Sequence, residues 1–242
     1  MRYRRVLLKI SGEVLKGKLS SGIDSEQLAF YAGEIKTITQ AGVQIALVVG
    51  GGNIVRGEKL SESGIERSTA DYMGMLGTVI NGLALQDALE QVGVYTRLQT
   101  AIHMEQVAEP YIRRRAVRHL EKGRVVIFSS GTGNPYFSTD TTAALRALEI
   151  GAEIFVKGTK VDGVYTDDPE KNPNARRYLQ LTYQEAIEKQ LKVLDGPAFA
   201  LCRDNKLPVI VCNVTHHGRL TAVLNGQGAH TVVKDFTNSV LE

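Results

Sequence analysis

Glycine, hydroxyl and isolated charged residues gather directly after four apolar segments of the chain. Lys9 closes the first segment, three glycines at 50–52 follow the second, and "SSGTGNPYFSTD" and "KGTKVDGVYTDDP" follow two later ones. Glycines let consecutive backbone N–H groups converge on phosphate oxygens, and a helix that begins there adds the positive end of its dipole. The four stretches together therefore predict a surface that binds a polyanion.

One such stretch alone is most often a tight strand-to-helix turn, so the prediction depends on all four and on Lys9 and Arg56 among the glycines. Two common phosphate-binding motifs do not fit. A Walker loop needs a lysine where Glu58 stands, and the dinucleotide fingerprint needs a glycine where Val55 stands. We therefore expect Lys9, at the end of its segment, to supply the cation for the phosphates.

The apolar segments have the length and composition of strands buried on both faces, and they alternate with segments of helical period. This pattern predicts an α/β fold, a three-layer α/β/α sandwich with a mainly parallel central sheet. The expected strands are 4–10, 43–49, 94–98, 124–128, 152–157, 208–212 and 230–234. The expected helices are 25–42, about 71–92, 105–122, 139–150, 182–190, 197–206 and 218–225.

Two of the expected helices have a clear apolar face. In the first helix, Asp24 is a candidate N-cap, Gln27 completes a capping box, and Gly42 ends the helix. The expected inner faces are Leu28, Ala32, Ile35 and Ile38 in this helix, and Tyr72, Leu76, Val79, Ile80, Leu83 and Ala84 in the longer one. Because ligands bind outside the carboxyl ends of parallel strands, the loops there should carry the function.

The composition limits the class of protein but does not identify a binding partner. The 242 residues, 43% hydrophobic and 23% charged, suit one α/β domain, 1–242, and the net charge of +3 is mild. Cys202 and Cys212 lack CxxC spacing and predict buried thiols in an intracellular protein. The apolar run in "MRYRRVLLKIS" is too short for a signal peptide or a membrane span, so we expect a cytoplasmic protein. The basic segment 111–124 is more typical of a solvated or inter-subunit helix face than of a nucleic-acid site.

Six long motifs, in order along nearly the whole chain, resemble those of bacterial uridylate (UMP) kinases of the amino-acid kinase superfamily. They are "LLKISGE", "VVGGGNIVRG", "DYMGMLGTVINGLALQDAL", "GTGNPYFSTDTTAA", "KGTKVDGVYTDDP" and "LTYQEAIEKQLKVLDGPAFALCRDNKLPV". The resemblance implies an open three-layer fold, a homohexamer, and transfer of the γ-phosphoryl group of MgATP to UMP in pyrimidine nucleotide biosynthesis. The chain departs from the family pattern at Tyr136, Ser138 and Gly196-Pro197, which puts fine specificity in doubt but not the reaction.

The resemblance also implies roles for individual residues. Lys9 would neutralise the transferring phosphoryl group, Arg56 would reach the phosphates, and Asp140 would orient Lys9 and Arg56. The phosphate chains would meet across Gly51 and Gly52, where a Cβ would take the space of a reacting oxygen. The implied ATP-binding residues are Lys9, Ile10, Ser11, Gly12, Gly52, Arg56, Thr159, Tyr165 and Asp168. The implied UMP-binding residues are Gly51, Asp71, Thr132, Gly133, Asn134, Pro135, Tyr136, Phe137, Ser138 and Thr139.

Three further expectations follow from the same resemblance. Asp71 would hold the ribose hydroxyls of UMP, although an aspartate at that place also fits a plain N-terminal helix cap. Mg²⁺ would be carried by the ATP phosphates, because the sequence has no dedicated carboxylate cage. GTP activation and UTP inhibition are typical of the family, and part of that response would lie at Gly17, Lys18, Leu19, Ser20, Ser21 and Gly22.

The expected acceptor explains why the glycine-rich strand ends hold no histidine. A phosphate monoester has a second pKa of about 6, so it is largely a dianion at neutral pH and needs no general base. The five histidines lie outside these ends. Two rivals stay open: a kinase of the same superfamily that acts on a carboxylate or carbamate, and a non-catalytic nucleotide-binding protein on the same fold. The presence of both Lys9 and Asp140 argues against the second.

Overall fold

The computed structural model describes residues 1–56, 60, 62–191 and 193–242 of the chain. Its described strands form one ten-stranded sheet in the order β10-β7-β9-β8-β6-β1-β2-β5-β3-β4. The strands are β1 (Arg5–Ile10), β2 (Gln44–Val49), β3 (Thr96–Thr100), β4 (Glu109–Pro110), β5 (Val125–Ser129), β6 (Ile154–Thr159), β7 (Tyr178–Leu181), β8 (Val209–Asn213), β9 (Thr231–Val233) and β10 (Val240–Leu241).

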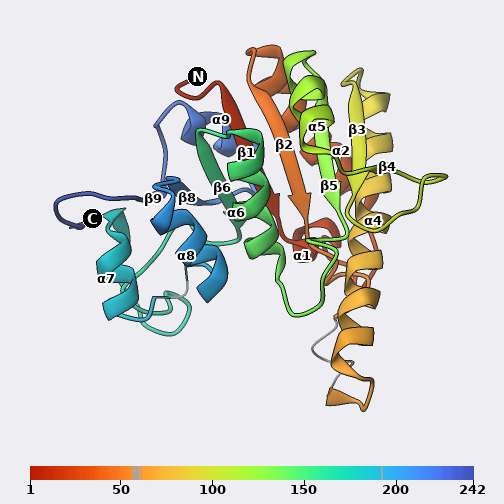
Figure 1. The fold of residues 1–242 in the computed structure, drawn as a ribbon. Coiled ribbons are helices and arrows are strands. Elements are labelled where there is room, and N and C mark those ends of the chain that lie inside the picture. The colour runs from red at the N-terminus through yellow and green to blue at the C-terminus, as the bar shows by residue number, and fades with distance from the viewer. Residues whose placement is uncertain (57–59, 61, 192) are drawn as a thin grey trace.

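Helices cover both faces of the sheet, as Figure 1 shows. The helices are α1 (Gly12–Leu15), α2 (Ser25–Gln40), α4 (Arg67–Gln91), α5 (Arg113–Glu121), α6 (Thr139–Ile150), α7 (Tyr183–Glu188), α8 (Gly196–Asp204) and α9 (Arg219–Leu224). Within β1, Leu8 and Ile10 join the core shared with α1, α2, α4 and α9, whereas Leu7 joins the core shared with α5, α6, α7 and α8. Because successive strand residues point to opposite faces, one apolar strand serves both cores. The predicted three-layer α/β/α fold is confirmed.

The four strands that precede the glycine-rich stretches lie side by side in the middle of the sheet. β6, β1, β2 and β5 are neighbours and run parallel, so their carboxyl ends meet at one edge, the lower edge in Figure 1. After β1 the chain continues to β2 on one side, while β6 flanks β1 on the other. The order of strands therefore switches between β1 and β6, which is where open α/β sheets bind ligands. Lys9 and Lys157 are paired in register across this boundary.

Some element predictions were incomplete or wrong. The sheet is mixed, because β9 runs antiparallel to β8 and β10 antiparallel to β7. The short elements β4, β7, β10 and α1 were not predicted, since two to four residues carry too little periodicity to be recognised. The expected helix 105–122 begins only at Arg113, because the segment before it contains β4 with Pro110, which pairs with β3. α4 begins at Arg67, one turn before the expected start.

The expected inner face of α4 was largely wrong. Of the predicted residues Val79 is buried, but Tyr72, Leu76, Ile80 and Leu83 are exposed by between 39% and 48%. The helix packs through Met75, Leu85 and Leu89 and, between them, through small and polar residues such as Gly77, Thr78, Asn81 and Gly82. A Cβ on Gly82 would lie 2.5 Å from Ser129 Oγ, so the helix can approach the sheet only at a glycine. A hydrophobic pattern cannot report a contact made by small residues.

Candidate active site

The carboxylate of Asp140 lies between two lysines at the switch in strand order. Asp140 Oδ1 is 3.0 Å from the Lys9 Nζ, and Asp140 Oδ2 accepts a hydrogen bond from the Lys157 Nζ at 2.7 Å. Lys157 also donates to the carbonyl of Val193 at 2.6 Å, which ties it to the segment before α8. Lys157 was missed by the sequence analysis, although it ends the expected strand 152–157 and Lys9 likewise stands near the end of β1.

Asp140 is nearly buried and remains ionised at neutral pH. Burial raises its pKa, but the charges of Lys9 and Lys157 and their hydrogen bonds outweigh burial and hold the pKa of Asp140 below its ordinary value. Two ammonium groups share one carboxylate, so this triad carries a net positive charge beside the glycine-rich edge. Such a charge attracts phosphate.

The glycines after β2 differ in what surrounds them. A Cβ on Gly51 would lie 2.6 Å from the carbonyl oxygen of Gly74, inside α4, and a Cβ on Gly50 would lie 2.9 Å from the Gly12 amide nitrogen. A Cβ on Gly52 would come no closer than 3.6 Å to any atom, the nearest being Glu13 Oε1. The sequence analysis explained Gly51 by the space that a reacting oxygen needs. The structure gives a different reason, because the packing of α4 already excludes a side chain at Gly51.

This difference predicts opposite outcomes for two alanine substitutions. Gly51→Ala should lower the free energy of unfolding by about 1–3 kcal/mol, because the backbone of α4 must move away. Gly52→Ala should leave the unfolding temperature unchanged and raise the KM for ATP about tenfold, since a methyl group would stand against the predicted phosphate contact. Thermal unfolding and initial rates measure the two effects. An unchanged KM for ATP in Gly52→Ala would remove that residue from the ATP site.

Arg56 is held by a carboxylate other than the one predicted. Its Nε donates to Glu13 Oε1 at 3.1 Å and its Nη2 contacts the same oxygen, while Lys16 Nζ lies 3.0 Å from Glu13 Oε2. Asp140 pairs with the lysines and not with Arg56. The expectation that Asp140 orients Arg56 was wrong, and Glu13 was missed because a carboxylate is not an expected neighbour of phosphate. Gly57, the last residue of the quoted motif, lies outside the described residues.

Asp71 lies beside the loop between β5 and α6. It is one turn inside α4, which begins at Arg67, so the alternative of a plain N-terminal cap was wrong. One oxygen of Asp71 accepts a hydrogen bond from the Tyr136 amide at 2.8 Å, and both oxygens lie 3.0 Å from Arg67 Nε. The structure thus brings together two parts of the predicted UMP site that are 65 residues apart in the chain.

The 130–138 loop has the backbone of a binding loop. Ser130 and Tyr136 have φ angles of 61° and 70°, and Gly131 and Gly133 share this left-handed region. Such conformations are strained for residues other than glycine and are most often retained at functional sites. Ser138 Oγ then accepts hydrogen bonds from the first amides of α6 and caps that helix. The remaining predicted UMP residues, Thr132, Asn134, Pro135, Phe137 and Thr139, lie along the same loop and at the start of α6.

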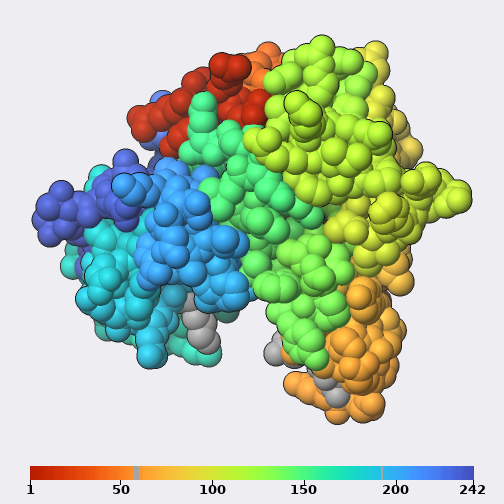
Figure 2. Space-filling model, in the orientation of Figure 1, coloured from red at the N-terminus to blue at the C-terminus, as the bar shows by residue number. Residues whose placement is uncertain are grey.

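Thr159, Tyr165 and Asp168, predicted for the nucleoside of ATP, line one hollow of about 500 Å³ after β6. Lys157 and Val193 also line it, so the hollow extends to the lysine of the Asp140 triad. Figure 2 shows an open notch at the same edge, between the residues around α7 and α8 and those at the start of α4. The residues predicted for the nucleoside of ATP therefore follow β6, and the loop that carries most of the predicted UMP residues follows β5, with β1 and Lys9 between these two strands.

The segment expected to carry the effector response is joined to the glycine loop. Gly22 donates its amide to the Asn53 carbonyl at 3.0 Å, and Asn53 Nδ2 donates to the Gly22 carbonyl at 2.8 Å. Asn53 also exchanges hydrogen bonds with Asn81 of α4, whose Nδ2 donates to the Gly50 carbonyl at 2.7 Å. Ser20 and Ser21 line a hollow of about 440 Å³ together with Gly52, Arg56 and other residues.

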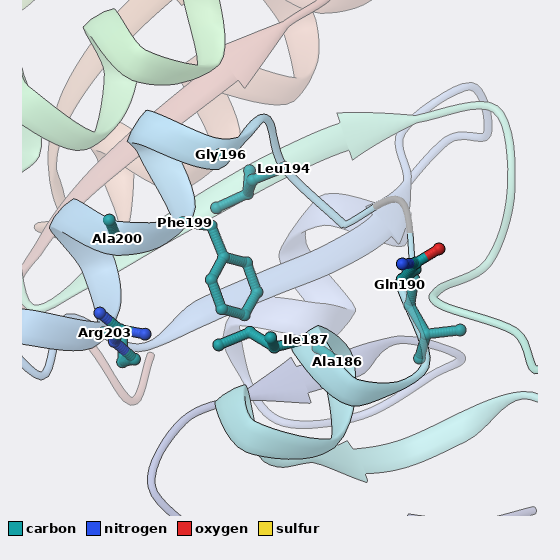
Figure 3. Close-up of a pocket in the computed structure, with 9 residues that line it drawn as sticks. Ala186, Ile187, Gln190, Leu194, Gly196, Phe199, Ala200 and Arg203 are labelled. Carbon is teal, nitrogen blue, oxygen red and sulfur yellow. The ribbon is translucent and has the colours of Figure 1, made fainter.

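A third hollow, with an apolar lining, lies between α7 and α8 and takes no part in this arrangement. Figure 3 shows Phe199 of α8 and Ile187 of α7 pointing toward each other across it. It is lined further by Ala186, Leu194, Ala200 and Arg203, and none of the predicted site residues borders it. Among the residues that the structure describes, Gln190 and Leu191 line both this hollow and the nucleoside hollow.

Within the described part of the chain, no group of three or more histidine, cysteine or acidic side chains could hold a metal ion. The carboxylates of Glu13 and Asp140 are each paired with two cationic side chains. No helix among these residues is both long and apolar enough to cross a membrane.

The fold and the site define a nucleotide-binding phosphotransferase: cations and glycine-rich strand ends gather at the switch point of a three-layer sheet. Residues 4–213 match the amino acid kinase family, and the chain belongs to this family. It is similar over its whole length to solved structures of UMP kinases. The structure from Bacillus anthracis is 38% identical, with 100% of both chains covered and a TM-score of 0.96.

Two further structures extend this comparison. UMP kinase from Ureaplasma parvum is 39% identical, with 97% of this chain and 100% of the other covered and a TM-score of 0.92. Uridylate kinase from Archaeoglobus fulgidus is 29% identical, with 94% and 99% covered and a TM-score of 0.73. The similarity is thus higher to the two bacterial structures than to the one from Archaeoglobus.

Proposed function

We propose that this protein is a UMP kinase, which transfers the γ-phosphoryl group of MgATP to UMP and releases UDP and ADP. The observation that carries the proposal is the position of Lys9, Asp140 and Lys157 between two sets of predicted contacts. On one side Asp71 joins the 130–138 loop, and on the other the hollow after β6 suits a nucleoside. The full-length similarity to UMP kinases supports the same reaction.

The chemistry requires two polyanions to approach each other. Phosphoryl transfer depends mostly on positioning and on stabilising the charge that develops on the γ-phosphoryl oxygens. Since UMP is already a dianion, the protein has to offset repulsion rather than remove a proton. Three cations are placed for this task. The carboxylate of Asp140 pairs with Lys9 and Lys157, and the carboxylate of Glu13 pairs with Arg56. We assign Lys157 to the phosphate side of ATP, because it borders the nucleoside hollow.

Magnesium would enter this site bound to the phosphates of ATP. The nearby carboxylates are engaged by lysines and arginine, so the described residues offer the metal no cage of their own. When bound, Mg²⁺ would neutralise part of the charge of the phosphates. The protein's own contribution is then the three cations and the amides of the glycine loop.

The direct test is a panel of acceptors. The purified protein is given MgATP and, in turn, UMP, CMP, dTMP, aspartate, acetylglutamate and carbamate, and ADP release is measured. We expect turnover with UMP well above that with the other acceptors. Turnover of an amino acid or carbamate with none of UMP would instead assign the protein to the carboxylate or carbamate kinases of the same family. Binding of ATP without turnover of any acceptor would assign a non-catalytic role.

Substitution of Asp71 tests the UMP side. Asp71→Asn keeps the shape of the side chain but loses the charge that lets one carboxylate accept two hydroxyl donors. We expect the KM for UMP to rise about 10- to 100-fold, while kcat and the KM for ATP change less than about threefold. Glu66→Gln, at the cap position of the same helix, is the matched control. A KM for UMP equal to that of the wild type would assign Asp71 only to its contacts with Tyr136 and Arg67.

We also propose that the protein is a homohexamer, as the family resemblance implies. Tyr72, Leu76, Ile80 and Leu83 form an exposed apolar stripe on α4, and an apolar stripe of this kind marks a protein–protein contact. A stripe that pairs with itself about a two-fold axis gives dimers, and a second contact joins dimers into a ring.

Charge on this stripe should therefore break the assembly. Ile80→Glu buries a carboxylate in the proposed contact, and we expect sedimentation velocity to show a smaller species than the wild type at the same concentration. Val240→Glu places the same charge on an exposed apolar residue of β10 and should leave the sedimentation coefficient unchanged. A wild-type coefficient for Ile80→Glu would remove this stripe from the assembly.

Three expectations accompany the proposed reaction. We propose that GTP activates and UTP inhibits through the 17–22 segment, since its hydrogen bonds to Asn53 reach the glycine loop. We propose that residues 1–242 act as one domain, because a single sheet contains the described strands. We also propose a cytoplasmic location, where the two buried cysteines remain thiols.

A further inference from the structure

A carboxylate lies at the place where two polyanions are proposed to meet. Glu13 is in the first turn of α1, and its Oε1 would be the atom nearest to a Cβ on Gly52, at 3.6 Å. A negative charge there repels phosphate unless cations offset it. Both of its oxygens are engaged by cations of the same chain, Oε1 by Arg56 and Oε2 by Lys16. Its presence therefore requires an explanation within the proposed reaction.

The backbone that carries this carboxylate is held close to the glycine loop. Ser11 Oγ accepts a hydrogen bond from the Glu13 amide at 3.3 Å, which caps α1. Gly12 approaches the glycine loop so closely that a Cβ on it would lie 2.7 Å from the Gly50 carbonyl oxygen. Since α1 is held against this loop, the backbone of Glu13 stays beside the loop, and Lys16 Nζ holds the carboxylate by Oε2. These two contacts make the carboxylate a fixed point of the site.

Arg56 is the group that needs such a fixed point. Its side chain is long and 46% exposed, so it loses rotamer entropy when it is ordered. Glu13 binds the edge formed by Nε and Nη2, and among the described residues no acceptor is found for Nη1. A guanidinium has five donors in a planar fork, so donors remain for a phosphate after the carboxylate has taken one edge.

We infer that Glu13 is a positioning residue, which holds Arg56 by one edge so that the other faces the transferring phosphoryl group. The inference rests on the proposed function. Burial raises the pKa of Glu13, but hydrogen bonds from Arg56 and Lys16 outweigh burial and lower it, so the carboxylate is charged at neutral pH. Because Glu13 acts through Arg56, its removal should affect kcat and should have no effect once Arg56 is absent.

A double-mutant cycle tests the inference. Initial rates with MgATP and UMP are measured for the wild type, Glu13→Ala, Arg56→Ala and the double variant. We expect Glu13→Ala to lower kcat about 30-fold, with the KM for UMP within about twofold, and to add less than about twofold to Arg56→Ala. Glu13→Gln keeps an acceptor oxygen and should retain kcat within about fivefold. Glu121→Ala, which removes the acid of an exposed ion pair with Arg118, is the matched control.

Any of the following results of the double-mutant cycle would overturn the inference. A kcat equal to or above that of the wild type in Glu13→Ala would mean that the carboxylate competes with phosphate for Arg56 instead of presenting it. If Glu13→Ala lowers kcat by the same factor in the presence and absence of Arg56, Glu13 has a role independent of Arg56. If Arg56→Ala retains the wild-type kcat, Arg56 has no role in the transfer and Glu13 cannot act by positioning it. If the wild type uses another acceptor, the proposed function fails, and the same cycle run with that acceptor still tests Glu13.

Discussion

Replacing Lys9 by alanine should lower kcat about 1,000-fold while leaving the affinity for UMP nearly intact. Lys9 is the last residue but one of β1, at the switch in strand order, with its ammonium 3.0 Å from Asp140. A cation that meets the charge developing on the transferring group contributes mainly in the transition state, and loss of one such donor costs about 10²- to 10³-fold in kcat. We place Lys9 at the upper end because the alanine variant also leaves Asp140 with only one lysine.

Two measurements separate this role from its alternatives. Steady-state rates give kcat, and calorimetric titration of UMP into the variant gives its affinity without turnover. Lys122→Ala is the matched control, because Lys122 is an exposed lysine just after α5, before β5 begins, at the opposite edge of the sheet. A Lys9 variant with wild-type kcat would discard the role in transfer. Lost UMP binding with preserved kcat would make Lys9 a binding residue only.

The sequence was sufficient to predict the layers of the fold and the edge that carries the site. Buried parallel strands such as β1, β2 and β5 are almost entirely apolar, and glycines mark the loops after them, so both signals are local. The strand order is not local. Lys157 could be recognised as the partner of Lys9 only once β6 is known to flank β1, although a lysine that ends an apolar strand was a usable signal.

Contacts between elements account for the rest of what the sequence analysis missed. Gly51 and Gly82 are needed where α4 meets the glycine loop and β5, and no periodicity of apolar residues reveals such an approach. The apolar stripe of α4 gave a strong helical pattern that identified the helix correctly but the buried face wrongly, because the pattern does not say which apolar side chains the sheet covers. No sequence pattern identified Glu13 as a site residue, because its partner Arg56 is 43 residues away in the chain.

Replacing Asp140 by asparagine should lower both activity and stability. The amide cannot balance two ammonium groups, so Lys9 and Lys157 repel each other and leave their positions in the site. We expect kcat to fall about 100-fold, since both cations are misplaced together. We expect the free energy of unfolding at neutral pH to fall by about 3 kcal/mol, the usual cost of removing one partner from a buried ion pair.

The dependence of stability on pH distinguishes this explanation from simple misfolding. The native pKa of Asp140 lies below its value in the unfolded chain, so the carboxylate stabilises the protein above about pH 4, and this contribution disappears as the pH falls through the native pKa. The gap in unfolding free energy between the wild type and Asp140→Asn should therefore be largest at neutral pH and shrink in acid. Urea unfolding at a series of pH values measures it. A gap that stays constant down to pH 3 would show that the charge of Asp140 does not hold the two lysines in place.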